Sequence, residues 1–435
     1  RMDDADVIVV GAGAAGLAAA RTLARRALRV LLIEARDRVG GRVLTRATTR
    51  PLIPAELGAE FIHGTARETI ELLRAAGTAA VDIGAREFWN LEDGRLQRDD
   101  DAFISSASIF EATRSLREDE SADRFLRRFE GDVAMRPAAR DARAFVEGFE
   151  AADPAIASAC AIGDEWRSGV DSRSARPLGG YAPMFDWLEN DCSAAGVRIC
   201  FATVARAIAW RRGTVTVDLG SEMGRRHARA AILTLPAGVL RHRGDESEIA
   251  FEPPLPLAKS EALAHIEMGH VVRVVLAFRT PFWERLRNGR YRDAAFFHGE
   301  GRRFPSYWTQ LPVRGEQVVA WAGGPKAVAL QGIAEAELIA LAVKGFGELF
   351  DESALAQAEF AGGMMHHWTD DAFARGAYSY ITVGGEGARA ALGAPLDGAL
   401  FFAGEATSTD GQGGTVNGAL QTGVRAANEV MRALA

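Results

Sequence analysis

The stretch Asp6-Val-Ile-Val-Val-Gly-Ala-Gly-Ala-Ala-Gly-Leu17 decides the fold, because an apolar strand runs directly into a glycine turn and an alanine-rich helix. A second apolar run, Val30-Leu-Leu-Ile-Glu34, follows and ends on an acid. Gly11 allows the tight turn, Gly13 lets the backbone approach a pyrophosphate, and Gly16 lets the helix pack closely on the strand. The terminal glutamate is placed to accept hydrogen bonds from a ribose diol. The stretch therefore predicts a βαβ dinucleotide-binding unit rather than a glycine turn that merely joins two elements.

Two further glycine-rich stretches follow this unit and extend the expected ligand. Gly40-Gly41-Arg42 offers backbone that can lie against a ligand and a guanidinium that can pair with a phosphate. Leu57-Gly-Ala-Glu-Phe-Ile-His-Gly64 is suited to passing beneath a flat ring. A nicotinamide enzyme does not need a second phosphate-side element, whereas an extended FAD does, because its flavin half lies well beyond the first turn. The sequence therefore favours FAD.

The composition is that of a globular protein with more than one core. The chain has 435 residues, 48% of them hydrophobic and 25% charged, which is too long for one ordinary domain. A net charge of −7 and the lack of a basic cluster with interleaved aromatics argue against a nucleic-acid partner. No secretory leader and no run long enough to span a bilayer is evident, so no membrane partner is expected.

The cysteines and histidines predict no metal site. Three cysteines have no ligand spacing, no His-Glu-x-x-His motif occurs, and the odd cysteine count fits a reducing, cytoplasmic location. Abundant alanine, and arginine in place of nearly all lysine, indicate a GC-rich bacterial genome. The sequence gives no indication of the oligomeric state.

The middle of the chain reads as helical. We expect an amphipathic helix over 66–76, further helices over 104–128 and 142–162, and a solvated turn at 99–101. These segments would form a helical lid over a substrate, or surface helices without a substrate role. Beyond them, strands are expected at these segments: 197–204, 215–218, 231–235, 271–278, 318–321 and 400–403. Helices are expected over 184–195 and from 413 to 431.

Three motifs and the C-terminal segment resemble the flavin-containing amine oxidases, the family that holds monoamine oxidases, polyamine oxidases and related demethylases. The motifs are GAGAAGL from Gly11, EARDRVGGR from Glu34 and ELGAEFIHG from Glu56. The resemblance is close for the flavin half and loose from about residue 65 to 174. It implies an α/β chain of two domains. A Rossmann-like FAD-binding domain of the glutathione-reductase type would comprise 1–65, 175–245 and 390–435, and an interleaved substrate-binding domain of mixed sheet plus helices would comprise 66–174 and 246–389.

The glycine pattern and the resemblance together give the expected cofactor contacts. In the family, a backbone at Val204 holds adenine, Gly404-Glu405 contacts the flavin's linker, and the last helix points its N-terminus at the pyrimidine ring, where negative charge develops on reduction. The expected FAD-binding residues are Gly11, Gly13, Ala14, Ala15, Gly16, Glu34, Ala35, Arg36, Gly40, Gly41, Arg42, Gly58, Ala59, Glu60, Phe61, Val204, Thr234, Gly404, Glu405, Gly414, Thr415, Val416 and Ala419.

The resemblance implies FAD-dependent oxidation of an amine C–N bond. Hydride would pass to flavin N5, the imine would hydrolyse to an aldehyde and an amine or ammonia, and dioxygen would reoxidise the flavin to give hydrogen peroxide. The expected substrate is a small primary amine or a polyamine. The candidate catalytic residues are Arg273, Tyr378, Tyr380, His63 and Thr415. The tyrosines would line the flavin's face, guide the amine and exclude water.

Three departures from the family pattern qualify this expectation. Arg273 stands where the family usually has a lysine that holds a water against flavin N5, and arginine cannot act as a proton-accepting base. It could still hold a water, steady a reduced flavin or pair with a substrate carboxylate, so an amine or amino-acid dehydrogenase using another acceptor stays open. Ala377 replaces the cysteine of covalent flavin attachment, so FAD should be non-covalent. Thr415 replaces a second cage tyrosine and leaves room for a bulkier substrate.

Two other points stay open. His63 is a candidate substrate or proton-relay residue, or a structural histidine that caps the turn. A carotenoid or porphyrinogen desaturase and a non-catalytic flavoprotein share the same scaffold and are the alternative functions.

Overall fold

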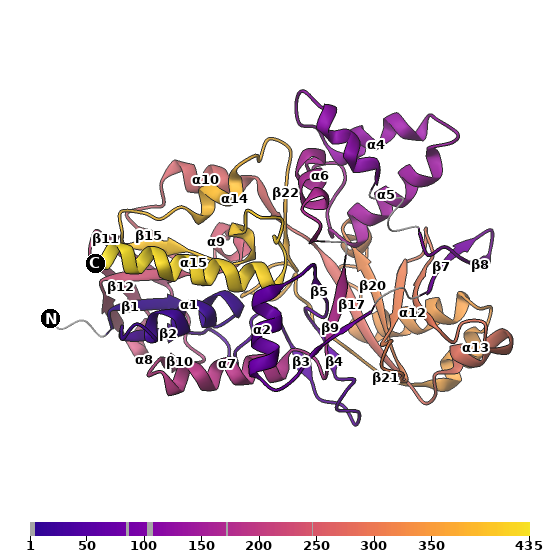
Figure 1. The fold of residues 1–435 in the computed structure, drawn as a ribbon, viewed down its shortest axis with the longest axis horizontal. Coiled ribbons are helices and arrows are strands. Elements are labelled where there is room, and N and C mark those ends of the chain that lie inside the picture. Colours follow the sequence, from indigo (N-terminus) through magenta and orange to yellow (C-terminus); the bar gives the residue numbers. More distant parts are fainter. Residues whose placement is uncertain (1–4, 84–86, 102–107, 171–172, 246) are drawn as a thin grey trace.

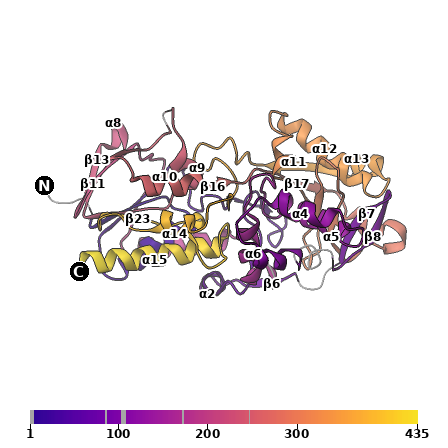
Figure 2. The same ribbon diagram turned by 90° about the horizontal axis from the view of Figure 1, so that it is seen from above.

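Two lobes and a cap of helices make up the molecule. The computed structural model describes residues 5–83, 87–101, 108–170, 173–245 and 247–435. The lobes lie along the long axis, with α15 (Val416–Leu434) at one end and α12 (Glu335–Glu348) and α13 (Ser353–Glu359) at the other (Figures 1 and 2).

The first lobe is built on a five-stranded parallel sheet. In spatial order its strands are β10 (Arg198–Cys200), β2 (Val30–Ile33), β1 (Val7–Val10), β14 (Ala230–Leu233) and β23 (Leu400–Phe402). Strands β1 and β2 are short, fully apolar and completely buried, as strands covered on both faces must be. The expected strand–turn–helix–strand order of the dinucleotide unit is therefore present, with α1 (Ala14–Ala24) between β1 and β2.

Alternate residues of this sheet pack into two different cores. Val7 and Val9 face α1, α15 and α7 (Ala182–Ala194). Ile8 and Val10 face a second, four-stranded sheet. In spatial order that sheet consists of β13 (Arg225–Ala228), β12 (Thr214–Asp218), β11 (Ala207–Arg211) and β15 (Ala250–Glu252). The period of two along β1 thus places helices on one face and a sheet on the other.

The second lobe is built on a seven-stranded mixed sheet. Its strands in spatial order are β21 (Phe360–Met365), β17 (Val271–Phe278), β20 (Gln317–Gly323), β19 (Ser306–Thr309), β18 (Ala294–His298), β7 (Glu87–Glu92) and β8 (Arg95–Arg98). Neighbouring strands are antiparallel except β7 and β18, which run parallel. Alternate side chains such as Val274 and Leu276 pack against α12 and α13. The opposite face of the sheet is left to line a cavity.

The cap differs from the two long helices expected over 104–128 and 142–162. Within the described residues it consists of four shorter elements: η1 (Ile109–Ser115), α4 (Ala122–Glu130), α5 (Arg136–Gly148) and α6 (Ala159–Arg167). Residues 102–107 lie outside the described part. The breaks have a local cause, because Ser121 and Ser158 begin α4 and α6 as N-caps, each accepting a backbone N–H three residues later.

Small sheets and short helices complete the fold. Three small sheets pair β5 (Ile62–His63), β9 (Ser174–Pro177) and β6 (Ala80–Asp82); β3 (Thr45–Arg46) and β4 (Ala55–Glu56); and β16 (Ile266–Met268) and β22 (Ser379–Ile381). The remaining elements are α2 (Arg67–Ala75), α8 (Gly220–Met223), α9 (Ala237–Arg241), α10 (Leu257–Ala264), η3 (Phe282–Gly289), α11 (Pro325–Val328), α14 (Ala388–Gly393) and η4 (Glu405–Thr407).

The chain crosses between the lobes later than the expected boundaries at residues 65 and 245. Helix α2 packs on α15 and α7 of the first lobe. Strand β15 pairs with β11, and α10 packs on α14, so the segment 247–264 also lies with the first lobe. The two-domain division itself stays a prediction.

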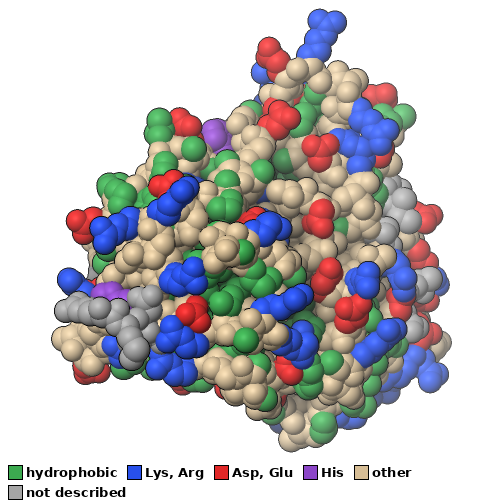
Figure 3. Space-filling view, turned by 60° about the vertical axis from the view of Figure 1, so that its left-hand side comes forward, with side chains coloured by type: hydrophobic (Ala, Val, Ile, Leu, Met, Phe, Trp, Pro, Cys, Tyr) green, Lys and Arg blue, Asp and Glu red, His purple; other side chains and the backbone are tan. Residues whose placement is uncertain are grey.

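Within the described residues, no helix is long and apolar enough to cross a bilayer. On the face shown in Figure 3, basic and acidic side chains are intermixed around small hydrophobic areas.

A buried glutamate at the junction makes the stability pH-dependent. Glu56 accepts hydrogen bonds from the Tyr181 amide at 2.7 Å and from the Thr45 hydroxyl at 2.9 Å. A Cβ at Gly180 would lie 2.3 Å from a Glu56 carboxyl oxygen, so glycine is required beside it. Burial raises the pKa of Glu56 to about 7, more than the hydrogen bonds lower it.

We expect Glu56→Gln to stabilise the protein at pH 8. The native Glu56 carboxyl keeps its proton up to a pKa of about 7, whereas the unfolded chain releases it near 4.3. The stability that this proton provides is complete below the unfolded pKa and is lost as the pH rises through the folded pKa. A glutamine at this position carries no titrating proton, so its contribution to stability does not change over this pH range. Urea denaturation of both proteins at pH 4.5 and pH 8 measures this effect. Between these two pH values, the difference in free energy of unfolding between variant and wild type should grow by on the order of 2–3 kcal/mol. A constant difference would contradict the assignment.

Candidate active site

One continuous cavity of about 1010 Å³ connects the two lobes. It begins at the glycine turn after β1 and ends against strands β7, β18 and β19 of the large sheet. Pockets for small ligands have volumes of about 300–1,000 Å³, so this cavity is at the upper end of that range. Every expected cofactor-contacting residue lines it except Gly16.

The glycine turn presents an uncapped helix N-terminus to the cavity. Gly13 is the N-cap of α1, and no side chain caps that end. The first amides of the helix are therefore available to an anion, which the helix dipole also favours. Gly11 has φ +104°, which favours glycine. Gly16 faces the strand instead of the cavity, because a Cβ there would lie 1.7 Å from the Gly11 carbonyl oxygen. Its role is helix–strand packing.

The acid at the end of β2 lies at the same end of the cavity. Glu34 accepts hydrogen bonds from the amides of Ala12 at 2.7 Å and Arg36 at 2.8 Å. These two bonds fix the carboxylate and leave further lone pairs. Thr203 and Val204, which follow β10, line the cavity beside it. The expected strand over 197–204 is shorter than predicted, since β10 ends at Cys200.

The second glycine pair packs against the first turn. Gly41 has φ +59°, and a Cβ there would lie 3.5 Å from the Gly13 Cα. That distance is an ordinary van der Waals contact, so the two turns pack against each other and the positive φ is what favours glycine at Gly41. Arg42 follows and donates to a Glu405 carboxyl oxygen at 2.8 Å and to the Ala377 carbonyl at 2.9 Å. The two ends of the chain thus meet over the middle of the cavity.

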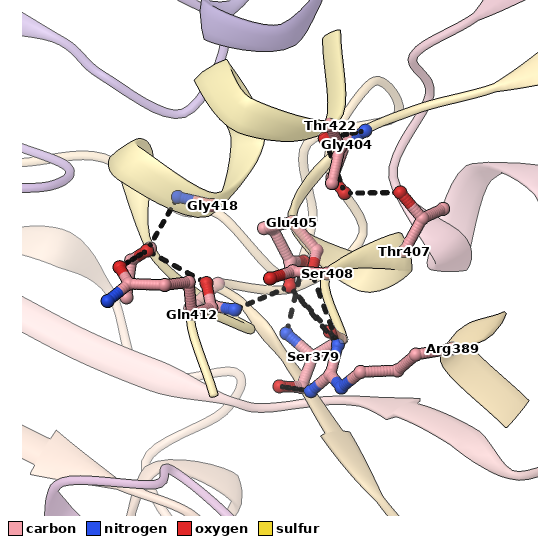
Figure 4. Close-up of polar contacts among 12 residues, drawn as sticks. Ser379, Arg389, Gly404, Glu405, Thr407, Ser408, Gln412, Gly418 and Thr422 are labelled. Atoms are coloured by element: carbon pink, nitrogen blue, oxygen red, sulfur yellow. Dashed lines mark hydrogen bonds and ion pairs between the residues drawn. The ribbon is translucent and has the colours of Figure 1, made fainter. Parts of the chain in front are cut away.

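Glu405 is the centre of a buried polar network (Figure 4). It accepts hydrogen bonds from the Ser379 hydroxyl at 2.5 Å and the Gly414 amide at 2.9 Å, and Arg389 lies 3.8 Å away. Burial raises the pKa of Glu405, but Arg42 and Arg389 lower it by more, so the net shift is downward and the carboxylate is ionised. The network holds the segment 413–415 at the cavity wall.

Thr415 begins the C-terminal helix. Its hydroxyl accepts from the Gly418 amide at 2.9 Å and donates to the Gln412 carbonyl at 2.8 Å. The hydroxyl is therefore the N-cap of α15, and this N-terminus lines the cavity through Gly414, Thr415 and Val416. A helix N-terminus at this place stabilises negative charge.

Arg273 on β17 is buried in an ion cluster on the opposite wall. Its guanidinium donates to Glu60 at 2.5 Å, and Arg176 donates to the other Glu60 oxygen at 2.7 Å. The Trp308 indole N–H also donates to Glu60, at 2.9 Å. Burial raises the pKa of Glu60, but the two guanidiniums lower it by more. The Nε atom of Arg273 is buried without a hydrogen-bond partner in the described part of the chain.

Aromatic side chains line the inner part of the cavity, and Tyr380 is not among them. Tyr378 lines the cavity, and its hydroxyl donates to the Phe149 carbonyl of the cap. Tyr380 lies two residues further along β22, which is about 6.6 Å along a strand. It is 7% exposed and belongs to the core of the cap. The expected contact of Tyr380 with a flavin or substrate is therefore not supported, while Phe149, which the sequence did not single out, lies beside Tyr378.

His63 lines the cavity as a neutral imidazole. Its ring centroid lies 5.2 Å from that of Phe149, and its Nδ1 lies 3.4 Å from the Ser174 hydroxyl. Burial lowers the pKa of His63 to about 4. The side chain is therefore an uncharged hydrogen-bonding group at neutral pH. No group of metal-ligating side chains occurs within the described ranges.

Comparison with known proteins identifies the family. The family model described as "Flavin containing amine oxidoreductase" matches residues 14–431. The chain belongs to this family. The amine oxidoreductase is 28% identical to polyamine oxidase 2 of Arabidopsis thaliana over 97% of its own length and 87% of the relative. It is 25% identical to lysine-specific histone demethylase 1 homolog 1 of Arabidopsis thaliana, over 98% of its own length and 52% of that protein.

Solved structures of the same fold confirm the architecture. A putrescine oxidase bound to putrescine superposes with a TM-score of 0.81 at 22% identity, covering 98% of this chain and 99% of that one. Cyclohexylamine oxidase from Brevibacterium oxydans superposes with a TM-score of 0.82 at 21% identity, covering 99% of both chains.

The residues of this chain fit the FAD that the family carries. The uncapped α1 N-terminus and the close Gly13–Gly41 approach suit a pyrophosphate. Glu34 suits a ribose diol, and Arg42, Glu405 and the α15 N-terminus follow along the same cavity. The lining of this cavity thus fits the cofactor of a flavin-dependent amine oxidoreductase.

Proposed function

We propose that this protein oxidises the C–N bond of a primary amine or polyamine and passes the electrons to dioxygen, giving hydrogen peroxide. The single observation that carries the proposal is the continuity of the cavity from the glycine turn to Tyr378, His63 and Arg273. When bound, FAD supplies the hydride acceptor, so the chain needs to provide only orientation, exclusion of water and electrostatics.

Each wall of the cavity has a task in this proposal. The α15 N-terminus stabilises negative charge on the cofactor ring. Tyr378 and Phe149 form an apolar wall for the amine and exclude water. His63 is neutral and serves as a hydrogen-bonding group rather than as a charged acid. Ala377 carries no nucleophile, so we expect the flavin to be non-covalent and to leave on acid precipitation.

Arg273 favours an amine over an amino acid as substrate. A substrate carboxylate would need a free cation, but the Arg273 guanidinium is already engaged by Glu60. Two relatives act on amines by their names, a polyamine oxidase and a putrescine oxidase. A dehydrogenase with another acceptor is the second candidate, because arginine replaces the lysine that the family uses beside the flavin.

Anaerobic bleaching of the flavin by amines tests the proposal. The purified protein should be yellow, and a primary amine or polyamine added without oxygen should bleach it. Release of one peroxide per amine in air identifies an oxidase, whereas bleaching that air does not reverse identifies a dehydrogenase. A yellow protein that no amine bleaches would sink the proposal and favour a desaturase or a non-catalytic flavoprotein. The free cysteines Cys160, Cys192 and Cys200 agree with a cytoplasmic location, which we also propose.

A further inference from the structure

A row of polar side chains crosses the floor of the cavity from Arg273 outward. The strand registers place Arg273 beside Trp321, Trp321 beside Ser306, Ser306 beside His298, and His298 beside Asn90. All five side chains line the cavity. Neighbouring strands lie about 4.8 Å apart, so three steps place His298 about 14 Å from Arg273.

The roof of the cavity runs parallel to this floor. Asp141, Phe145 and Phe149 line the cavity at helical spacing, so they share one face of α5 and its C-terminal end. Phe149 lies at the inner end, where it meets Tyr378 and His63. Eight residues of helix span about 12 Å, which places Asp141 opposite the outer end of the floor. The α5 face therefore changes from aromatic at its inner end to acidic at its outer end.

The outer end carries polar groups that the described residues leave without partners. His298 has its Nδ1 3.1 Å from the Ser306 hydroxyl, and its Nε2 has no hydrogen-bond partner within the described ranges. Burial lowers the pKa of His298 to about 4, so the ring is neutral. Asp141 has no ion pair in the described part of the chain. Burial raises the pKa of Asp141 to about 6, with Arg140 lowering it and the nearby acids Asp99, Glu300 and Glu92 adding to the rise.

The cations at this end are already paired with acids. Arg140 and Lys326, which add to the effect of burial in lowering the pKa of His298, are paired with Glu300 at 3.0 Å and with Glu147. Arg98 is paired with Glu87 at 2.7 Å and with Asp100 at 2.6 Å. Arg173 is paired with Asp82 at 3.1 Å. An acidic, partly buried site with a free imidazole nitrogen is therefore left, and a cationic donor group suits it best.

We propose that the outer end of the cavity, formed by Asn90, His298 and Asp141, binds the second amino group of a linear di- or polyamine whose first C–N bond is oxidised at the inner end. The inference rests on the proposed function and specifies its substrate class. The span from Arg273 to His298 and the span from Phe149 to Asp141 both indicate a substrate whose amino groups lie about 10–15 Å apart. Between the two ends, the Trp321 ring on the large sheet and the Phe145 ring on α5 line the cavity and suit the methylene chain.

Matched pairs of amines test the inference. Each linear diamine, from diaminobutane to diaminododecane, is compared with the alkyl monoamine of the same carbon number. In the wild type, kcat/KM for the diamine should exceed that for the monoamine by about tenfold to a hundredfold once the chain is long enough to reach His298. Asp141→Asn and His298→Ala should remove most of this preference through KM and leave the monoamine unchanged. Asp370→Asn, an exposed carboxyl outside the cavity, is the matched control and should keep the preference.

Calorimetry separates failure of the inference from failure of the function. The dithionite-reduced holoenzyme cannot oxidise amines, so its affinity for long diamine and matched monoamine can be measured without turnover. A diamine preference that Asp141→Asn abolishes supports the outer site even if no amine bleaches the oxidised flavin, a result that would overturn the proposed function alone. Equal affinity for diamines and monoamines, or a preference that both variants keep, overturns the outer site.

Discussion

Gly13→Val should give a folded protein that does not retain flavin. The backbone at Gly13 has φ −77°, which any residue adopts, and a Cβ there would meet nothing closer than the Gly40 carbonyl oxygen at 3.9 Å. The protein alone therefore tolerates a side chain at this position. The valine would instead fill the part of the cavity in front of the α1 amides. Loss of two amide–phosphate bonds costs about 3 kcal/mol or more, which weakens binding at least about a hundredfold.

The ratio of flavin to protein absorbance after gel filtration measures this loss. Two further glycine variants serve as controls. Gly131→Val is on the surface, with φ −71° and no atom within 4 Å of the added Cβ, and should keep its flavin. Gly16→Ala places a methyl 1.7 Å from the Gly11 carbonyl and should fail to fold. A soluble Gly13→Val protein with the melting temperature of the wild-type apoprotein and a full complement of flavin would contradict the placement of the pyrophosphate.

The parts of the fold that the sequence predicts well are those that depend on local spacing. The strand–turn–helix–strand order around Gly11 follows from neighbouring residues, and β17 was expected at the bounds that the structure gives it. The prediction of two long helices in the cap is wrong, because two serine N-caps divide segments whose apolar periodicity looks continuous. Alternation would place Tyr378 and Tyr380 on the same face, but only Tyr378 reaches the cavity, because Tyr380 packs into the core of the cap.

The contacts of the site that depend on register could not be predicted from sequence. Asn90, His298 and Ser306 each look like ordinary strand residues, and only the pairing of β7, β18 and β19 brings them into one row. The contact between Glu60 and Arg273 could not be predicted from sequence either. Both were expected near the cofactor from the family motifs, yet their mutual ion pair spans 213 residues of sequence and changes what Arg273 can do.

Glu60→Ala should be among the most destabilising single substitutions in this protein. Glu60 is 5% exposed and accepts from Arg273, Arg176 and Trp308. Its removal leaves two buried guanidiniums without a counter-charge, a situation that costs about 3–5 kcal/mol. Arg176 keeps its bonds to the Leu311 and Thr309 carbonyls, so most of the loss falls on Arg273. The urea midpoint of the apoprotein measures the effect without a contribution from bound flavin.

A double variant distinguishes an unpaired charge from a simple loss of packing. Glu60→Leu with Arg273→Met removes two of the three ions and fills the space with apolar atoms, while Arg176 keeps its two carbonyl bonds. The double variant should therefore recover part of the stability that either single substitution loses. Glu71→Ala removes an exposed glutamate that pairs with Arg67 on the surface and should leave the midpoint unchanged. If Glu60→Ala lowered the midpoint no more than Glu71→Ala, the cluster would not hold the cavity wall. Recovery in the double variant with lost amine oxidation would instead show that the Glu60–Arg273 pair is kept for the reaction, because apolar side chains in its place stabilise the fold as well.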